Sequence, residues 1–226
     1  MSVKKVYGKD AEKLKEKKVL IVGIGGLGCT VANLLARMKV KLILIDDDIV
    51  DDTNLERQTL FETKDLLEQK CIVAKEKLEQ FTSIEAINKR LIEENIDIIP
   101  KDIDLIIDCT DNVETRLLIN RYCHDNNIPW IYSGAVGNIG IIYFINNDKP
   151  CYECLNKNKQ GETSCEIGVL NTTVTMVAAI TAHNAIDFLI KGKVENNIIR
   201  ITENNLTKII PKRDPRCTIC QENAHV

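Results

Sequence analysis

Several features are missing from this sequence, and each absence excludes a class of protein. No uninterrupted apolar run reaches the roughly 20 residues that a membrane-spanning helix requires. Residues 1–18 are rich in lysine and acidic residues and lack the apolar core and small-residue cleavage site of a secretory signal. With a net charge of -3 and a pI near 5.7, the chain lacks the broad basic surface of nucleic-acid-binding proteins. We therefore expect a cytoplasmic protein that binds neither membranes nor nucleic acids, although a small nucleotide remains a candidate ligand.

The composition is that of an ordinary globular protein. Of the 226 residues, 44% are hydrophobic and 28% are charged. A chain of this length buries roughly 70% of its unfolded surface and needs no disulfides to fold. The sequence contains no internal repeat and no linker, so it predicts a single domain over residues 1–226.

Short apolar segments alternate with segments of helical spacing over the first 130 or so residues. Strands are expected at 18–23, 40–46, 84–91, 105–109, 129–133 and 140–145, and helices at 25–38, 64–81, 113–126 and 172–191, before short terminal strands. This alternation predicts an α/β fold with a Rossmann-like, doubly wound, mainly parallel sheet. Ligands of such sheets bind at the carboxyl ends of the strands, so the chemistry is expected in those loops.

A glycine-rich turn directly follows the first expected strand, with glycines at Gly23, Gly25, Gly26 and Gly28. Glycines there let the backbone turn tightly and approach a phosphate, which the following helix N-terminus attracts. Asp46 ends the second expected strand, where a carboxylate accepts hydrogen bonds from ribose hydroxyls. NAD and ATP fit this pattern equally, and a turn that only packs strand against helix is the remaining alternative.

Further charged residues favour ATP over NAD. The sequence continues with Asp46-Asp47-Asp48, then Asn54-Leu55-Glu56-Arg57-Gln58, then Lys70, and Thr110-Asp111-Asn112 follows the fourth strand. Arg57 and Lys70 are suited to neutralise phosphate oxygens while Asp111 holds Mg²⁺ against them, as in phosphoryl and nucleotidyl transfer. Hydride transfer has no use for these groups, although any one of them alone would be an ordinary solvated surface charge.

These motifs, together with Asp108 and Arg116 and the paired cysteines below, resemble the ThiF/MoeB/HesA adenylyltransferases. That family shares its adenylation domain with ubiquitin-activating enzymes, and the resemblance covers about residues 8 to 220. It implies binding of the ribose by Asp46, of the phosphates by Arg57 and Lys70, and of magnesium by Asp111. The nucleotide pocket would also include Gly23, Gly25, Gly26, Gly28, Asp48, Asn54 and Asn112.

The reaction that the resemblance implies is attack by a carboxylate on the α-phosphate of MgATP, which gives an acyl adenylate and pyrophosphate. A C-terminal carboxyl group has a pKa of about 3.3–3.7, so the nucleophile is already ionised and no general base is needed. The expected substrate is a small ubiquitin-like or sulfur-carrier protein ending in Gly-Gly, and a homodimer and a separate sulfur donor are expected partners. A non-catalytic scaffold and an NAD-dependent oxidoreductase are the alternative functions.

Two C-x-x-C pairs, Cys151 with Cys154 and Cys217 with Cys220, provide four thiolates for a tetrahedral zinc ion. A dithiol redox pair is the alternative, but the family places a structural zinc at these positions. A closed four-sulfur site has no open position for a substrate, so the zinc would act as a staple. The chain then divides into a helical lead-in over 1–17, a nucleotide-binding core over 18–146 and a zinc-stapled part over 147–226.

The other cysteines divide into one candidate and four packing residues. Cys165 matches a family cysteine that in some members links covalently to the carrier, as a thioester or a persulfide. A single loop cysteine is otherwise an unremarkable small side chain. Side chains expected only to pack are Cys29, Cys71, Cys109, Cys123, Trp130 and His183.

The sequence departs from the family pattern in three places. An N-terminal segment that supplies an arginine to the partner subunit's site is absent, and Lys9, Lys13 and Lys15 are speculative substitutes. Leu67 replaces a glycine three residues before Lys70, which is expected to alter how the loop presents that lysine. No rhodanese-like or ubiquitin-fold segment follows, so sulfur delivery is expected to depend on a separate protein.

Overall fold

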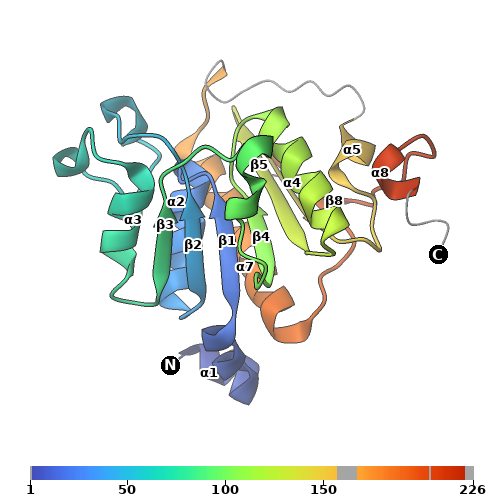
Figure 1. Cartoon of the computed structure of the whole chain (residues 1–226), viewed down its shortest axis with the longest axis horizontal. Helices are drawn as coiled ribbons and strands as arrows, with labels where there is room; N and C mark the ends of the chain where they lie inside the picture. Colours follow the sequence, from blue (N-terminus) through green and yellow to red (C-terminus); the bar gives the residue numbers. More distant parts are fainter. Residues whose placement is uncertain (1, 157–166, 204, 222–226) are drawn as a thin grey trace.

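An eight-stranded sheet forms the centre of the molecule, in the strand order β3-β2-β1-β4-β5-β6-β7-β8 (Figure 1). The computed structural model describes residues 2–156, 167–203 and 205–221. The first five strands in the chain are parallel, namely β1 (Lys18–Val22), β2 (Lys41–Ile45), β3 (Ile84–Ile87), β4 (Leu105–Asp108) and β5 (Trp130–Val136). Antiparallel pairing adds β6 (Ile139–Ile145), β7 (Ile198–Thr202) and β8 (Asn205–Ile209). This strand order confirms the prediction of a Rossmann-like, mainly parallel sheet.

Helices connect the strands and cover both faces of the sheet. The α-helices are α1 (Ser2–Tyr7), α2 (Gly26–Arg37), α3 (Lys70–Leu78), α4 (Val113–Asp125), α5 (Tyr152–Leu155), α7 (Asn171–Lys191) and α8 (Thr218–Gln221). Short 3₁₀ segments are η1 (Gly8–Glu16), η2 (Asp52–Asn54), η3 (Thr63–Asp65) and η4 (Glu93–Ile98). In Figure 1, α4 and α5 lie in front of the sheet and α2 and α7 lie behind it.

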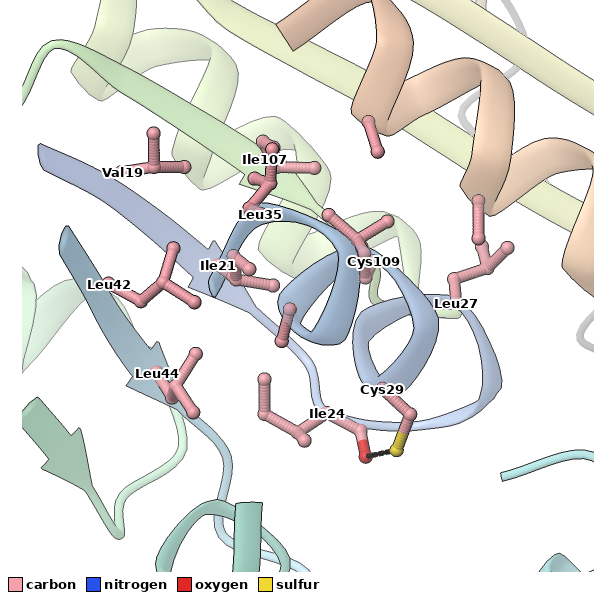
Figure 2. Packing of buried hydrophobic residues seen from close by; sticks show 14 of the residues in the cluster. Val19, Ile21, Ile24, Leu27, Cys29, Leu35, Leu42, Leu44, Ile107 and Cys109 are labelled. Atoms are coloured by element: carbon pink, nitrogen blue, oxygen red, sulfur yellow. Dashed lines mark hydrogen bonds between the residues drawn. The ribbon is translucent and has the colours of Figure 1, made fainter. Parts of the chain in front are cut away.

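Side chains that alternate along the parallel strands form two separate hydrophobic cores. Val19 and Ile21 of β1 point to the face covered by α2, α3 and α7, where Figure 2 shows them beside Leu35 of α2. Leu20 and Val22 point to the opposite face, under α4. Because both faces are buried, these strands are continuous apolar runs, and polar chemistry is confined to the loops at their ends.

Helix α7 is a core helix in this fold. With 21 residues it is long and apolar enough to cross a membrane by length and composition, and half of its most apolar window is buried. It packs against α2, β5 and β6, with Val177, Ala178 and Ala185 fully buried. His183 was expected to pack in this helix, but its side chain is exposed, because its position faces away from the sheet. Trp130 is buried as predicted.

The expected single helix over residues 64–81 is wrong. Leu67 adopts a φ of +69°, which no helix contains, and its N–H donates to the carbonyl oxygen of Val50 at 3.0 Å. Gln69 forms a β-bridge with Ile49, so α3 begins only at Lys70. This local pairing overrides the helical spacing, and it places Lys70 beside the end of β2.

The N-terminal segment packs at the end of the sheet opposite the loops expected to carry function. In Figure 1 it lies below the start of β1, whereas the strands end at the other side. The hydroxyl of Tyr7 donates to Asp187 of α7 at 2.7 Å and fixes α1 there. Lys13 and Lys15 form ion pairs with Asp10 and Glu12 within the same segment. The segment lies away from the carboxyl ends of the strands of its own chain, and the suggested role of its lysines at a partner subunit's site stays a prediction.

Candidate nucleotide-binding site

A cavity of about 790 Å³ opens at the carboxyl ends of the parallel strands. Its lining includes nearly all residues that the sequence marked for nucleotide binding, namely Gly23, Gly25, Gly26, Asp46, Asp48, Asn54, Arg57, Lys70, Asp111 and Asn112. Gly28 does not border the cavity, and Cys165 lies outside the described residues. The tertiary fold thus brings together residues that are separated by almost 90 positions in the chain.

Glycine serves three different structural purposes at Gly23, Gly25 and Gly28. Gly23 has a φ of +87°, and a Cβ there would lie 2.9 Å from the carbonyl oxygen of Cys109. A Cβ on Gly28 would lie 1.9 Å from the carbonyl oxygen of Gly23, so this glycine permits helix packing and does not contact the cavity. Gly25 has ample space around it and is the N-cap of α2. Without a side chain, Gly25 leaves the first amides of the helix accessible to an anion.

Asp46 joins the end of β2 to the glycine turn. Its carboxylate accepts hydrogen bonds from the N–H of Ile24 at 2.5 Å and from the N–H of Asp48 at 2.8 Å. Burial raises the pKa of Asp46, and these two hydrogen bonds and Lys70 oppose the shift. The carboxylate is therefore fixed in orientation at the cavity wall, where it can accept hydrogen bonds from a ribose.

Lys70 is a buried cation with one carboxylate partner. Only 4% of its surface is exposed, and its Nζ donates to Oδ2 of Asp48 at 2.7 Å. The N–H of Lys70 also donates to the carbonyl oxygen of Asp48 at 3.0 Å, so backbone and side chain are both fixed. Because Asp48 is exposed while Lys70 is not, a phosphate entering the cavity would meet a preoriented ammonium group.

Arg57 and Gln58 approach the cavity from the segment that follows η2. A guanidinium nitrogen of Arg57 donates to the carbonyl oxygen of Thr53 at 3.1 Å and to Glu56 at 3.2 Å. Gln58 is buried, and its amide donates to Oδ1 of Asn54 at 2.6 Å. The guanidinium group of Arg57 and the hydrogen-bonded amides of Gln58 and Asn54 therefore line the cavity together.

Asp111 projects from the turn between β4 and α4, and its side chain is exposed. The next residue, Asn112, is the N-cap of α4 and accepts the N–H of Thr115 at 2.8 Å. At the base of the turn, Asp108 is fully buried, and burial raises the pKa of its carboxyl group although Arg116 opposes the shift. The cavity is thus lined by carboxylates that follow two strands, β2 and β4, and by the cations Arg57 and Lys70.

The four cysteines of the two C-x-x-C pairs form one cluster, made by α5 and α8 and the residues before them. The Sγ atom of Cys151 lies 3.5 Å from that of Cys217 and 4.0 Å from that of Cys154, and the Sγ atoms of Cys154 and Cys220 are 3.6 Å apart. A tetrahedral zinc with Zn–S distances of about 2.3 Å separates its sulfur ligands by about 3.8 Å. The four thiols, all within 4.8 Å of one another, therefore fit one zinc ion.

A family model described as the ThiF family matches residues 1–221 of this chain. This chain belongs to the ThiF family. A molybdopterin-synthase adenylyltransferase from Haemophilus influenzae is 40% identical over 189 residues, which cover 80% of this chain and 77% of that protein. The sulfur carrier protein ThiS adenylyltransferase of Escherichia coli is 33% identical over 220 residues, covering 92% of this chain and 88% of that protein.

Solved structures show the same fold. The crystal structure of E. coli MccB with ATP has a TM-score of 0.81 and 27% identity, and the match covers 93% of this chain and 68% of MccB. MccB with an N7-isoasparagine form of MccA matches with the same TM-score and 26% identity. The predicted family is confirmed, and this ThiF-family chain is an enzyme of the adenylyltransferase type.

Sequence reasoning missed part of the cavity lining in this ThiF-family chain. Lys89 and Arg90 border the cavity because β3 ends at Ile87, whereas the expected strand continued to residue 91. Tyr132 and Tyr152 line it from β5 and α5. The position of Lys89 and Arg90 just after a parallel strand could have identified them as lining residues. Tyr152 reaches the cavity only through tertiary packing, which no sequence pattern indicates.

Proposed function

We propose that this ThiF-family chain uses MgATP to adenylate the C-terminal glycine carboxylate of a small ubiquitin-like sulfur-carrier protein. The observation that carries the proposal is Lys70, a buried and preoriented cation in a cavity that Arg57, Asp46 and Asp111 also line. The names of the relatives, which include adenylyltransferases for ThiS and for molybdopterin synthase, support the substrate class. They do not support the alternative of an NAD-dependent oxidoreductase.

The residues present suit this reaction step by step. An ionised carboxylate oxygen of the carrier forms a bond to the α-phosphorus, and the bond from that phosphorus to the bridging oxygen breaks to release pyrophosphate. Lys70 and Arg57 would lower the repulsion between the anionic nucleophile and the triphosphate. Lys70 would exchange its contact with Asp48 for a phosphate oxygen, at little cost because Asp48 is exposed to water.

The nucleotide would be held at two strand ends. Asp46 would accept hydrogen bonds from the ribose hydroxyls, and the α2 N-terminus after Gly25 would bind a phosphate. Asp111 would hold magnesium, which supplies charge neutralisation at the phosphates when bound. Asn54 and Asn112 would complete the wall between these points.

We also propose that the four-cysteine cluster holds a structural zinc ion. The sulfur separations support this proposal, and thiolates are ligands that zinc prefers. All four positions are taken by sulfur, so no position is left for a substrate. The zinc would tie the C-terminal segment that holds Cys217 and Cys220 to the loop after β6 that holds Cys151 and Cys154. We propose that this zinc-stapled part over 147–226 follows the lead-in over 1–17 and the nucleotide-binding core over 18–146 in a single adenylation domain over 1–226.

The wider setting is proposed from the family. The chain would act in the cytoplasm as a homodimer, without nucleic-acid or membrane partners, and a separate protein would donate sulfur to the activated carrier. Cys165 is proposed as a covalent attachment point for the carrier after adenylation. Because that step follows adenylation, the substitution Cys165→Ala should leave acyl adenylate formation intact.

ATP–pyrophosphate exchange tests the proposed function. Purified protein loaded with zinc would be assayed with each candidate ubiquitin-like carrier ending in Gly-Gly, one at a time. We expect exchange with one carrier and its loss when the last glycine of that carrier is removed. ATP binding without exchange for any carrier would instead support a non-catalytic scaffold of the same fold.

A further inference from the structure

A buried ion pair beneath the Asp111 turn has no role in the reaction described above. Asp108, the last residue of β4, has no exposed surface, and Arg116 of α4 is only 8% exposed. The Nε of Arg116 lies 3.4 Å from Oδ2 of Asp108. Burying two charges costs solvation energy that their attraction only partly repays, so a buried pair calls for a structural or functional reason.

The two side chains hold Thr110 by three different atoms. Oδ1 of Asp108 accepts hydrogen bonds from the N–H of Thr110 at 3.0 Å and from its Oγ1 at 2.6 Å. The carbonyl oxygen of Thr110 accepts a hydrogen bond from Nη2 of Arg116 at 2.5 Å. The N–H, the hydroxyl group and the carbonyl oxygen of Thr110 are thus all hydrogen-bonded, which restricts its backbone conformation.

Both sides of Asp111 are therefore anchored. Thr110 precedes it, and Asn112, which follows, is held as the N-cap of α4 by its bond to the N–H of Thr115 at 2.8 Å. At the base of the turn, Ser133 donates to the carbonyl oxygen of Asp108 at 2.6 Å. Asp111, which is exposed, borders the cavity at a turn whose shape the interior of the protein determines.

Arg116 is itself fixed by aromatic rings of the cavity wall. Its guanidinium carbon lies 5.1 Å from the centre of the Tyr132 ring, and the rings of Tyr132 and Tyr152 pack edge to face at 4.9 Å. Tyr152 follows Cys151 directly, and its N–H donates to the buried side chain of Asn120 at 2.9 Å. The guanidinium group is thus held on several sides while it bonds to the Asp111 turn.

We propose that Arg116, paired with Asp108, is a positioning residue that sets the carboxylate of Asp111 for a metal–nucleotide complex. The proposal rests on the proposed function, because it takes Asp111 as the magnesium ligand. Arginine suits this position because its planar fork serves Asp108 and the Thr110 carbonyl oxygen at once, which a lysine ammonium cannot do with the same geometry. Arg116 borders the cavity whereas Asp108 does not, and the positioning role requires neither side chain to contact the nucleotide.

The test compares ATP affinity in magnesium with ATP affinity in EDTA, by calorimetry on the zinc-loaded full chain. The main variant is the double substitution Asp108→Asn with Arg116→Gln, which removes both charges and leaves no unpaired buried ion. A second variant, Arg116→Lys, keeps a cation beside Asp108 but loses the fork. The control is Asp65→Asn with Lys77→Gln, which neutralises another partly buried ion pair whose residues do not line the cavity.

We expect the wild type and the control to bind ATP more tightly in magnesium than in EDTA. Both Arg116 variants should lose about tenfold of affinity in magnesium, a loss typical of removing a partner that orients a metal ligand. Their affinity in EDTA should be unchanged, because Asp46 and the glycine turn remain. Asp111→Asn should reproduce this selective loss.

Two results would overturn the positioning role. One is a full magnesium advantage in both Arg116 variants, and the other is an equal loss of affinity in magnesium and EDTA, which a general structural defect would cause. A wild type that binds ATP without any magnesium advantage would instead remove the magnesium role of Asp111, and this inference with it. The wild-type arm thus separates failure of the proposed function from failure of the inference.

Discussion

The nucleotide cavity and the four-cysteine cluster are both groups of reactive side chains, but they are held together differently. In the cavity, charged groups are already bonded to partners of the same chain, as Lys70 is to Asp48 at 2.7 Å and Asp46 is to the N–H of Ile24 at 2.5 Å. In the cluster, thiols such as those of Cys151 and Cys217 approach to 3.5 Å. Four thiols at such separations fit a shared cation, whose binding would require them to ionise.

Only the cysteine cluster depends on a ligand for its structure under this comparison. The cavity is preorganised by hydrogen bonds of the protein, so changing one of its residues should affect function more than stability. The cluster closes segments that are 66 residues apart in sequence, so losing its metal should affect stability first. Substitutions at the cluster and at the cavity should therefore differ in whether they change stability or activity.

The substitution Cys217→Ser should lower the free energy of unfolding by about 4–5 kcal/mol, because a structural metal site is lost. Thermal unfolding with and without a zinc chelator measures the effect. The wild type should lose stability on chelation, and the variant should not respond further. Cys71→Ala, at a buried cysteine outside the cluster, should keep the chelator response, and a Cys217→Ser variant as stable as the wild type would contradict the zinc site.

Lys70→Ala should reduce ATP–pyrophosphate exchange by about 10²–10³-fold, since a preoriented cation at the phosphates is removed. Thermal unfolding should change little, because the partner Asp48 is exposed and remains solvated. Lys64→Ala, at an exposed lysine outside the cavity, is the control and should retain full exchange. A large loss of stability in Lys70→Ala would show that the cavity, like the cluster, depends on this contact for folding.

Asp46 should make ATP binding and stability respond to pH in opposite directions. Burial raises its pKa in the folded protein above that in the unfolded chain, so folding favours the protonated form and stability falls as pH rises between the two values. Hydrogen bonds to ribose hydroxyls require the ionised form, so ATP affinity should rise over the same interval. Calorimetric titrations measure the ATP affinity and unfolding curves measure the stability, each as a function of pH. The difference between the wild type and Asp46→Asn should show both trends, because the variant lacks the titrating carboxyl group.

Leu67→Gly should stabilise the protein by about 0.5–1 kcal/mol, because glycine adopts the φ of +69° without the strain of a Cβ but costs more chain entropy. The side chain of Leu67 is 77% exposed, so little packing is lost. Leu67→Ala keeps the Cβ and should leave stability unchanged. Urea unfolding of the two variants measures the difference, and equal stability would show that the turn before Lys70 is unstrained.

The sequence was most informative where local chemistry determines structure. Continuous apolar runs marked the parallel strands, and the glycine turn with Asp46 marked the candidate nucleotide site, because both patterns follow from backbone sterics and strand burial. The resemblance carried by the motif from Asn54 to Gln58 and by the residues around Asp111 gave the family. Sequence reasoning failed at residues 64–81, where the pairing of Leu67 and Gln69 with the chain after β2 outweighs helical spacing.

Short-range patterns in the sequence are enough to specify the α/β class, the positions of most strands, the family and the two groups of reactive residues. The contacts of the folded chain were needed to show that Lys70 bonds to Asp48, that Gly28 serves packing and that Arg116 holds the Asp111 turn. Each of these depends on contacts between different elements of the fold. Such contacts arise from the packing of helices onto a twisted sheet, which no local pattern of residues specifies.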